Sequence, residues 1–361
     1  MNEYAVDVVI AVHSAERPVA RAAGSVLTGT QAPVRVTVVA HNIDPEIIRE
    51  RLGDLAGDPR LRLIGLADGI HSPAGPMNLG FARAEAPFVA LLGSDDELAP
   101  GAIDSWLALQ RETGADAVLA RILLASGEVD PYPPVRLGRR VRDLDGAKDR
   151  LAYRSAPLGM VSRERFGDLR LTTGVGSGED LVYSLTVWFT GAHLAYDLTG
   201  PAYVVNGDAG DRVTSAVRPL AEDSAFLDHL ETMPWFAQAP ARVREAIVVK
   251  LIRMHVFDAL AMRANSDEQL SENRDAFRTV LARLARLSPS APGLLSIADR
   301  RVLDALVSQQ SLDAAAMRSL IAARSRYKSP AVLLTRNPLR WFHAQAPFRT
   351  LLAGSLIARR R

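Results

Sequence analysis

The stretch Val89-Ala90-Leu91-Leu92-Gly93-Ser94-Asp95-Asp96-Glu97-Leu98 joins a predicted buried strand to three consecutive acids. This order places the acids at the carboxyl end of the strand, where open α/β sheets hold their ligands. Neighbouring carboxylates repel one another unless a cation lies between them. A hard divalent cation that also holds phosphate oxygens would supply that charge. The alternative is an acidic turn that only opens the next helix, where acids offset the helix dipole.

Short apolar runs alternate with longer polar-periodic segments around this stretch, which is typical of βαβ units. The predicted fold class is therefore α/β, with a Rossmann-like, mostly parallel sheet. We expect strands at 6–12, 34–40, 61–66, 87–92 and 117–124, and helices at 18–27, 45–55, 76–84 and 100–113. Further along we expect regular structure at 158–161, a helix at 180–189, and a pair of strands at 193–196 and 202–205.

From about residue 219 the pattern is helical. Apolar residues cover most of the circumference at 247–257, so we expect a buried helix there. We therefore predict an α/β domain at 1–218 and a helical domain at 219–361. Residues 126–147 give a poor signal, which indicates either a functional loop or a disordered insertion. Residues in the wider segment 126–154 are expected to line and shape part of the ligand site.

The net charge of +2 is unevenly divided along the 361 residues. Residues 1–313 contain all 41 acids and carry a charge of −8, whereas the residues after Asp313 include ten Lys and Arg and carry +10. The chain has no cysteine, which excludes disulfides, thiolate metal sites and thiol nucleophiles. The N-terminus lacks a signal-peptide pattern and no apolar run approaches the length of a spanning helix, so we expect a cytoplasmic protein.

Several short motifs follow one another in an order that is more specific than any single motif. They are the strand and turn at 7–17, the helix end at 23–30, the Asn-x-Gly-x-x-x-Ala helix at 78–84, the acidic turn at 94–97, the Glu-Asp helix start at 178–183, and the strand and loop at 201–206 and 212–214. Over residues 5–215 this succession resembles the nucleotide-sugar-binding half of family 2 of the inverting glycosyltransferases, which have the GT-A fold. The resemblance implies a glycosyltransferase of the hexosyltransferase type.

The resemblance also implies roles for individual residues. Asp96 would bind a Mg²⁺ or Mn²⁺ ion that neutralises the departing nucleoside diphosphate, with Asn206 as a further ligand. Asp180 would take the proton of the acceptor hydroxyl, with Glu179 as the alternate base. The other interpretation of this pair is a helix cap followed by first-turn acids. The residues expected to bind the nucleotide sugar are Ala11, His13, Glu16, Asn42, Asp44, Asn78 and Asp95.

Some positions depart from the family pattern. His41 and Asn42 stand where an aspartate usually reads the uracil edge, so the preference for a uridine donor is left open. Met77 replaces an arginine that often precedes the helix asparagine, and Asn206 stands where a metal-binding histidine is common. Because of these departures, a catalytically inactive member of the family is an alternative interpretation.

The implied reaction is the metal-dependent, inverting transfer of a sugar from a nucleoside-diphosphate donor to a hydroxyl acceptor. The family's usual donor, a UDP-sugar, is the expected one. By family analogy alone, the acceptor is a cell-surface polysaccharide, a teichoic-type polymer or a lipid-linked glycan. One alternative is an inactive nucleotide- or glycan-binding partner protein. Another is a nucleotidyltransferase, although the glycine-rich basic phosphate loop that it needs is missing.

Aromatic and aliphatic residues alternate with arginines in the tail at 327–361. This composition indicates a peripheral helix on the anionic inner face of the cell membrane. The alternative is that the apolar residues pack on the helical domain while the arginines are solvated. Nucleic-acid binding is not expected, because phosphate would repel the acidic body and no recognition module occurs. A homo-oligomer is left open.

Overall fold

The computed structural model describes residues 3–127, 141–207, 218–308 and 313–358. Its described residues form two units: the first contains 3–127, 141–145 and 154–207, and the second contains 146–153, 218–308 and 313–358. The Pro-rich stretch at 130–134, the motif at 212–214 and the last three arginines lie outside the described residues.

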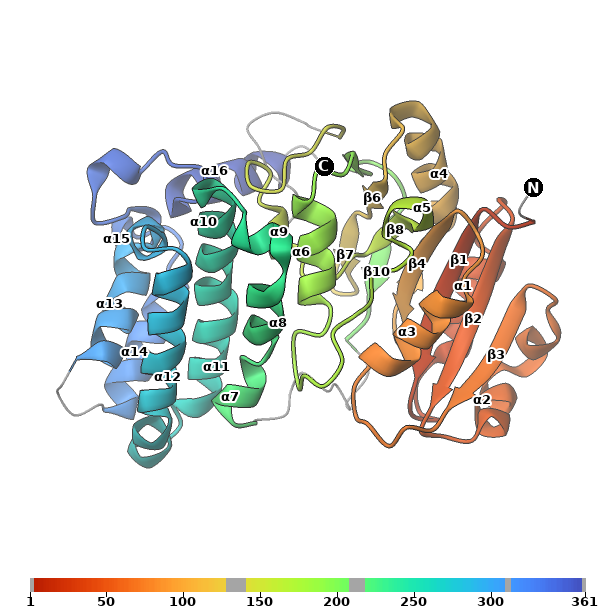
Figure 1. Ribbon diagram of the computed structural model, residues 1–361, viewed down its shortest axis with the longest axis horizontal. Coiled ribbons are helices and arrows are strands. Elements are labelled where there is room, and N and C mark those ends of the chain that lie inside the picture. Colours follow the sequence, from red (N-terminus) through yellow and green to blue (C-terminus); the bar gives the residue numbers. More distant parts are fainter. Residues whose placement is uncertain (1–2, 128–140, 208–217, 309–312, 359–361) are drawn as a thin grey trace. The chain divides into compact units, whose positions relative to one another are not determined.

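A seven-stranded sheet forms the centre of the first unit (Figure 1). Its strand order is β3-β2-β1-β4-β8-β6-β9, and β8 is antiparallel to both of its neighbours while the other pairs are parallel. The order reverses at β1, which lies between β2 and β4, so the switch point for ligand binding lies at the ends of these strands. The strands are β1 (Val6–Val12), β2 (Val34–His41), β3 (Leu61–Leu66), β4 (Phe88–Gly93), β6 (Ala117–Leu119), β8 (Gly159–Ser162) and β9 (Leu194–Tyr196).

Helices cover both faces of this sheet (Figure 1). Val8 and Ile10 of β1 belong to the core shared with α1, because alternate side chains of a strand point to one face. On the other face α3 approaches β1 so closely that a Cβ at Gly80 would lie 2.2 Å from Val9 Cγ1. The helices of this unit are α1 (Val19–Leu27), α2 (Pro45–Leu52), α3 (Ala74–Arg83), α4 (Ala102–Thr113), α5 (Arg163–Phe166) and α6 (Leu181–Phe189).

Two strand predictions are wrong in a way that matters for the site. The expected strand at 117–124 is two strands, because the chain turns after Leu119 and β7 (Ile122–Leu124) joins a second sheet. The expected pair at 193–196 and 202–205 is not paired: β9 pairs with β6, whereas β10 (Tyr203–Val205) lies between β5 (Glu97–Leu98) and β7. This three-stranded sheet holds β10 beside the chain that leaves the acidic turn.

The second unit is helical, as predicted, and its helix at Leu251–Val256 is a π-helix between α10 and α11. Residues 146–153 pack within this unit: Gln345 donates to Ala147 O at 2.7 Å and Arg253 donates to Tyr153 Oη at 3.0 Å. No helix in the described part of the chain is long and apolar enough to cross a membrane. The helices are α7 (Leu220–Asp223), α8 (Phe226–Thr232), α9 (Pro234–Ala237), α10 (Ala241–Lys250), α11 (Phe257–Arg263), α12 (Asp267–Leu287), α13 (Ile297–Val307), α14 (Ala314–Ala323), α15 (Pro330–Leu333) and α16 (Pro347–Ala358).

A buried ion pair fixes the start of the sheet. Asp7 and Arg35 are register partners on β1 and β2, and Arg35 Nε lies 2.6 Å from Asp7 Oδ1. The backbone N–H groups of Glu85 and Ala86 also donate to Asp7 Oδ2. Burial alone raises the pKa of Asp7, but Arg35 and these two donors outweigh it, so the net pKa is lowered. The pair therefore joins β1, β2 and the turn before β4.

We expect Asp7→Ala to lower the free energy of unfolding by roughly 3 kcal/mol at neutral pH, because Arg35 would stay buried with the exposed Glu85 as its remaining carboxylate partner. The folded-state pKa of Asp7 is depressed, so this stabilisation is present above the unfolded pKa, about 4, and is lost as pH falls through the folded value. Urea unfolding across pH should show a difference between wild type and variant that shrinks under acid. The partly exposed pair of Asp58 and Arg60 is the control, and Asp58→Ala should cost less than about 1 kcal/mol. Equal costs for the two variants would contradict the assignment.

Candidate active site

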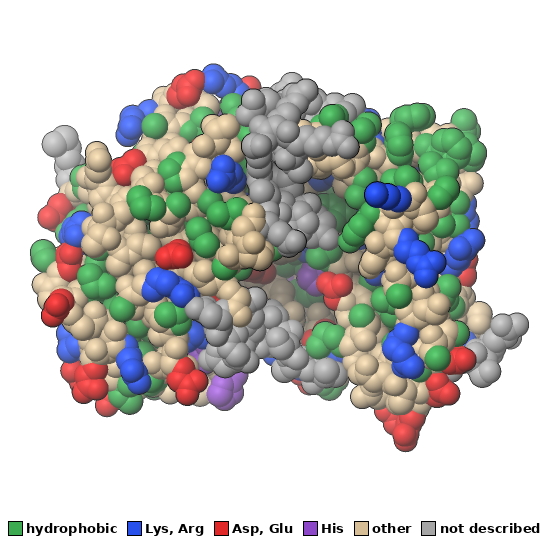
Figure 2. Space-filling model, turned by 180° about the vertical axis from the view of Figure 1, so that it is seen from behind, with side chains coloured by type: hydrophobic (Ala, Val, Ile, Leu, Met, Phe, Trp, Pro, Cys, Tyr) green, Lys and Arg blue, Asp and Glu red, His purple; other side chains and the backbone are tan. Residues whose placement is uncertain are grey.

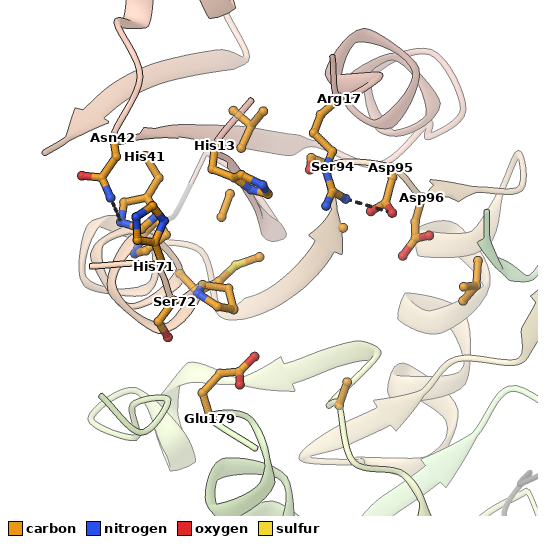
Figure 3. A pocket seen from close by; sticks show the side chains of 18 residues that line it. His13, Arg17, His41, Asn42, His71, Ser72, Ser94, Asp95, Asp96 and Glu179 are labelled. Atoms are coloured by element: carbon orange, nitrogen blue, oxygen red, sulfur yellow. Dashed lines mark hydrogen bonds and ion pairs between the residues drawn. The ribbon is translucent and has the colours of Figure 1, made fainter. Parts of the chain in front are cut away.

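A cavity of about 760 Å³ lies at the carboxyl ends of β1, β2 and β4 (Figure 3). Its volume falls within the ~300–1,000 Å³ that is usual for small-ligand sites. It occupies the switch point of the sheet, where the strand order reverses. The lining residues are Ala11, Val12, His13, Arg17, His41, Asn42, His71, Ser72, Pro73, Pro76, Met77, Gly93, Ser94, Asp95, Asp96, Ala156, Glu179 and Val205.

The carboxylate of Asp96 is held from two sides. The hydroxyl of Tyr203 donates to Oδ2 at 2.7 Å, and the backbone N–H of Asn206 donates to Oδ1 at 3.0 Å. The Tyr203 hydroxyl itself accepts from Gly93 N at 3.0 Å. A Cβ at Gly93 would lie 2.6 Å from Asp96 Oδ2, so a side chain there would displace the Asp96 carboxylate. Strand β10 therefore orients the acid that follows β4.

Tyr203 stays protonated in this arrangement. Burial raises its pKa well above the ordinary value, and the neighbouring charge of Asp96 raises it further. The phenol therefore acts as a hydrogen-bond donor to Asp96 throughout the physiological pH range. Tyr203 belongs to one of the motifs quoted above, but no local pattern indicates that its hydroxyl reaches the acidic turn.

Asp95 is paired with an arginine that was not assigned to the site from the sequence. Arg17 Nη1 lies 2.9 Å from Asp95 Oδ2, and both residues line the cavity (Figure 3). The guanidinium of Arg21 and the amide of Asn206 donate to the backbone carbonyl of Asp95. Arg17 thus reduces the repulsion between the adjacent acids. Asp95 is paired with this arginine, whereas Asp96 is held by Tyr203 and the backbone of Asn206, so the two carboxylates have different partners. In the sequence, the one sign of this role is that Arg17 is the last residue of the strand-and-turn motif at 7–17.

Polar side chains after β2 and β3 form a network at another edge of the cavity. His41 Nε2 lies 2.9 Å from Asp68 Oδ1, and Asn42 donates to Ile70 O and accepts from Gly69 N. The backbone N–H of Ile70 and the neighbouring His41 lower the pKa of Asp68, so this group stays charged. Asn42 adopts a φ of 55°, a conformation that asparagine tolerates better than most residues. In this structure its carboxamide therefore holds the loop at 69–70.

Glu179 lies on the wall opposite the acidic turn (Figure 3). It precedes α6, and Asp180 occupies the N-cap position of that helix without a side-chain capping bond. Asp180 is not among the residues that line the cavity. The structure thus places Glu179 on the cavity wall and Asp180 beside the cavity, off the wall.

The other predicted residues occupy different positions. Ala11, His13 and Asn42 line the cavity with Asp95 and Asp96. Asn78 instead binds both backbone groups of Leu171, which pins that segment to α3. Three further predicted residues also lie off the cavity wall: Asp44 caps α2 by accepting from Glu46 N, Glu16 is exposed in the turn after β1, and Asn206 is buried beside Asp95 and Asp96.

The acidic turn fits a divalent cation only together with phosphate oxygens. Among the described residues, no group of three or more His, Asp or Glu side chains could hold a metal ion. Mg²⁺ is usually bound through one or two carboxylates plus substrate phosphates, and the oxygens of Asp96 provide such a hard ligand on the cavity wall. The donor chemistry therefore fits an ion that arrives with a diphosphate.

A switch-point cavity in a mostly parallel sheet, with an acidic turn after β4, fits a GT-A-like glycosyltransferase fold. Residues 7–169 match the family model described as "Glycosyl transferase family 2". The chain therefore contains a domain that matches glycosyltransferase family 2 at residues 7–169, and it is a glycosyltransferase. The resemblance to family 2, the fold class and the class of enzyme that were expected from the sequence are thereby confirmed.

Solved structures show the same fold. The crystal structure of S. aureus TarS 1-349 in complex with UDP-GlcNAc is 14% identical with a TM-score of 0.69, covering 88% of this chain and 90% of that one. The crystal structure of S. aureus TarS has a TM-score of 0.63 at 14% identity and covers 88% and 55% of the two chains. At this identity the likeness concerns the fold. Among curated protein sequences, none matches the chain.

Proposed function

We propose that the protein transfers a sugar, with inversion, from a nucleoside diphosphate to a hydroxyl acceptor in a reaction that depends on Mg²⁺ or Mn²⁺. The observation that carries the proposal is the cavity itself, which has Asp95 and Asp96 on one wall and Glu179 on the other. A transfer with direct inversion needs charge stabilisation on the leaving-group side and a base on the acceptor side. Two acidic groups on facing walls match these two requirements.

The leaving-group side is formed by the acidic turn. Asp96 would hold the cation together with the diphosphate, and the cation, when bound, neutralises charge that develops on the departing nucleoside diphosphate. Tyr203 and the backbone N–H of Asn206 keep the Asp96 carboxylate in one orientation. Arg17 positions Asp95, which we propose contacts the ribose or shares the metal. We keep Asn206 as a candidate further ligand through its amide oxygen.

The acceptor side is formed by Glu179 and Asp180. In direct inversion the acceptor hydroxyl attacks the anomeric carbon from the face opposite the leaving group, so the base that takes its proton must lie on that side. Glu179 lies on the wall opposite the acidic turn, so we propose it as the base and retain Asp180, the first candidate from sequence, as its competitor.

The donor is proposed to be a UDP-sugar. Support comes from His13 and Asn42, which line the cavity and offer a ring to stack on a base and an amide to pair with one. Pairing would require Asn42 to release the loop at 69–70. The TarS structure named above contains UDP-GlcNAc, although the likeness to it concerns the fold. We propose a cytoplasmic reaction on a cell-surface polysaccharide, a teichoic-type polymer or a lipid-linked glycan.

A thermal-shift screen of nucleoside diphosphates and sugar nucleotides, each with and without Mn²⁺, tests the proposal. UDP or a UDP-sugar with Mn²⁺ should raise the melting temperature by roughly 5 °C at ligand concentrations near 100 times Kd. GDP and ADP with Mn²⁺ are the controls for base preference. No shift with any nucleotide would contradict a donor site. A shift without turnover across an acceptor panel would favour a binding partner, and pyrophosphate release from a nucleoside triphosphate would favour a nucleotidyltransferase.

A further inference from the structure

Two large apolar side chains project from the chain between α15 and α16. Leu339 is 94% exposed and Phe342 is 69% exposed; we call this pair the apolar wedge. Hydrophobic side chains gather on the surface of the C-terminal segment, at the upper right of Figure 2, with Lys and Arg side chains below them. From the sequence we expected the apolar residues throughout the tail at 327–361 to face a membrane, but Trp341 and Phe348 are only partly exposed. Leu339 and Phe342 are the two most exposed large apolar side chains of the described tail, ahead of Tyr327, Leu352 and Leu356.

The wedge is held in a defined conformation. The side chain of Asn337 accepts from Leu339 N at 3.0 Å, which starts a 3₁₀ turn at Pro338–Arg340. The indole of Trp341 donates to Thr335 O at 3.0 Å, and the ring of Phe342 packs edge-on against Phe348 with centroids 5.7 Å apart. Exposure of Leu339 and Phe342 is thus produced by a structured turn that directs both side chains outward.

Two arginines lie beside the wedge. Arg340 donates to Ser290 O at 3.2 Å, and Arg349 donates to Phe342 O at 3.1 Å. Both of these bonds are to backbone carbonyls, which leave the formal charge of each guanidinium in place. The tail itself has no acid after Asp313, but Glu245 lies 3.5 Å from His343 and Asp304 pairs with Arg336. Arg336, Arg340 and Arg349 outnumber these two acids, so the charge next to the wedge is positive on balance.

We propose that the apolar wedge inserts into the interface of an anionic phospholipid bilayer while Arg340 and Arg349 contact the headgroups. Apolar side chains flanked by cations bind such interfaces through buried area and through attraction to anionic lipid. A second copy of the chain is a poorer occupant of the same surface, because two copies would bring like charges together. This inference rests on the second unit alone and stands whether or not the proposed transfer reaction is correct.

Co-sedimentation of the full chain with vesicles tests the inference. Wild-type protein should bind vesicles made from equal parts of phosphatidylglycerol and phosphatidylcholine more tightly than vesicles of phosphatidylcholine alone. The double variant Leu339→Ser/Phe342→Ser should lower the partition coefficient on the anionic vesicles at least tenfold, about the effect of losing one well-buried side chain. Arg349→Gln should reduce binding to anionic vesicles and leave binding to neutral ones unchanged.

The matched control is Val307→Ser, because Val307 is a 51%-exposed apolar residue of the same unit that lies outside the tail. It should bind vesicles as the wild type does. Thermal melting of each variant checks folding, and the double variant should melt within a few degrees of the wild type, since Leu339 is exposed and Phe342 loses one contact, with Phe348. Equal partitioning of wild type and double variant would overturn the inference. So would self-association of the wild type that the double variant abolishes, since it would assign the wedge to a second copy.

Discussion

Replacing Asp96 with asparagine should lower turnover about a hundredfold or more, the usual cost of removing one group that stabilises developing charge. The asparagine side chain would keep one oxygen and lose the negative charge that holds a divalent cation. It would also leave either Tyr203 or Asn206 N without its present acceptor, because an amide nitrogen cannot accept a hydrogen bond. The measurement is donor hydrolysis and transfer as a function of Mn²⁺ concentration.

The control for this experiment is Asp104→Asn. Asp104 on α4 also accepts two backbone hydrogen bonds, from Gln31 N and Ala32 N, but it is not on the cavity wall. Its substitution should leave turnover and Mn²⁺ dependence close to the wild type. Tyr203→Phe should give an intermediate loss, roughly tenfold, with a weaker apparent affinity for Mn²⁺, as expected of a positioning residue. Wild-type turnover in the Asp96 variant would remove this residue from the mechanism.

The elements that bear the cavity could be predicted because their signals are local. Strand β1 occupies the predicted range Val6–Val12, and β3 occupies the predicted Leu61–Leu66. The strand at 117–124 was misjudged, because an apolar run does not reveal where the chain turns into another sheet. That distinction depends on β10, whose sequence lies about eighty residues away and pairs with both β5 and β7.

The site residues show the same contrast between local patterns and contacts of residues far apart in the sequence. Asp95 and Asp96 were found because neighbouring acids after a buried strand form a local pattern, and both line the cavity. Tyr203 and Arg17 were missed because their roles come from contacts across the fold: Tyr203 reaches Asp96 from a different sheet, and Arg17 reaches Asp95 from the turn after β1. For Asn78, the structure shows a contact that the motif does not reveal, since its side chain holds the backbone of Leu171.

Replacing Glu179 with glutamine should lower turnover by about a hundredfold to ten-thousandfold, the range for losing a general base, and leave donor affinity nearly unchanged. The reason is position: Glu179 faces the acidic turn across the cavity, so its carboxylate lies on the side from which an acceptor hydroxyl would approach. Glutamine preserves size and polarity but cannot take up the proton. The measurements are kcat for transfer and Kd for the donor by calorimetry.

Asp180→Asn is the matched variant, because it removes one carboxylate from the next residue, which is off the cavity wall. We expect it to lower kcat less than tenfold. The reverse pattern, a large loss in Asp180→Asn and a small one in Glu179→Gln, would return the base to Asp180 and show that the cavity changes shape when the acceptor binds. If neither substitution slowed transfer, the facing carboxylates would have no part in proton removal, and the proposed inverting mechanism would lose its base.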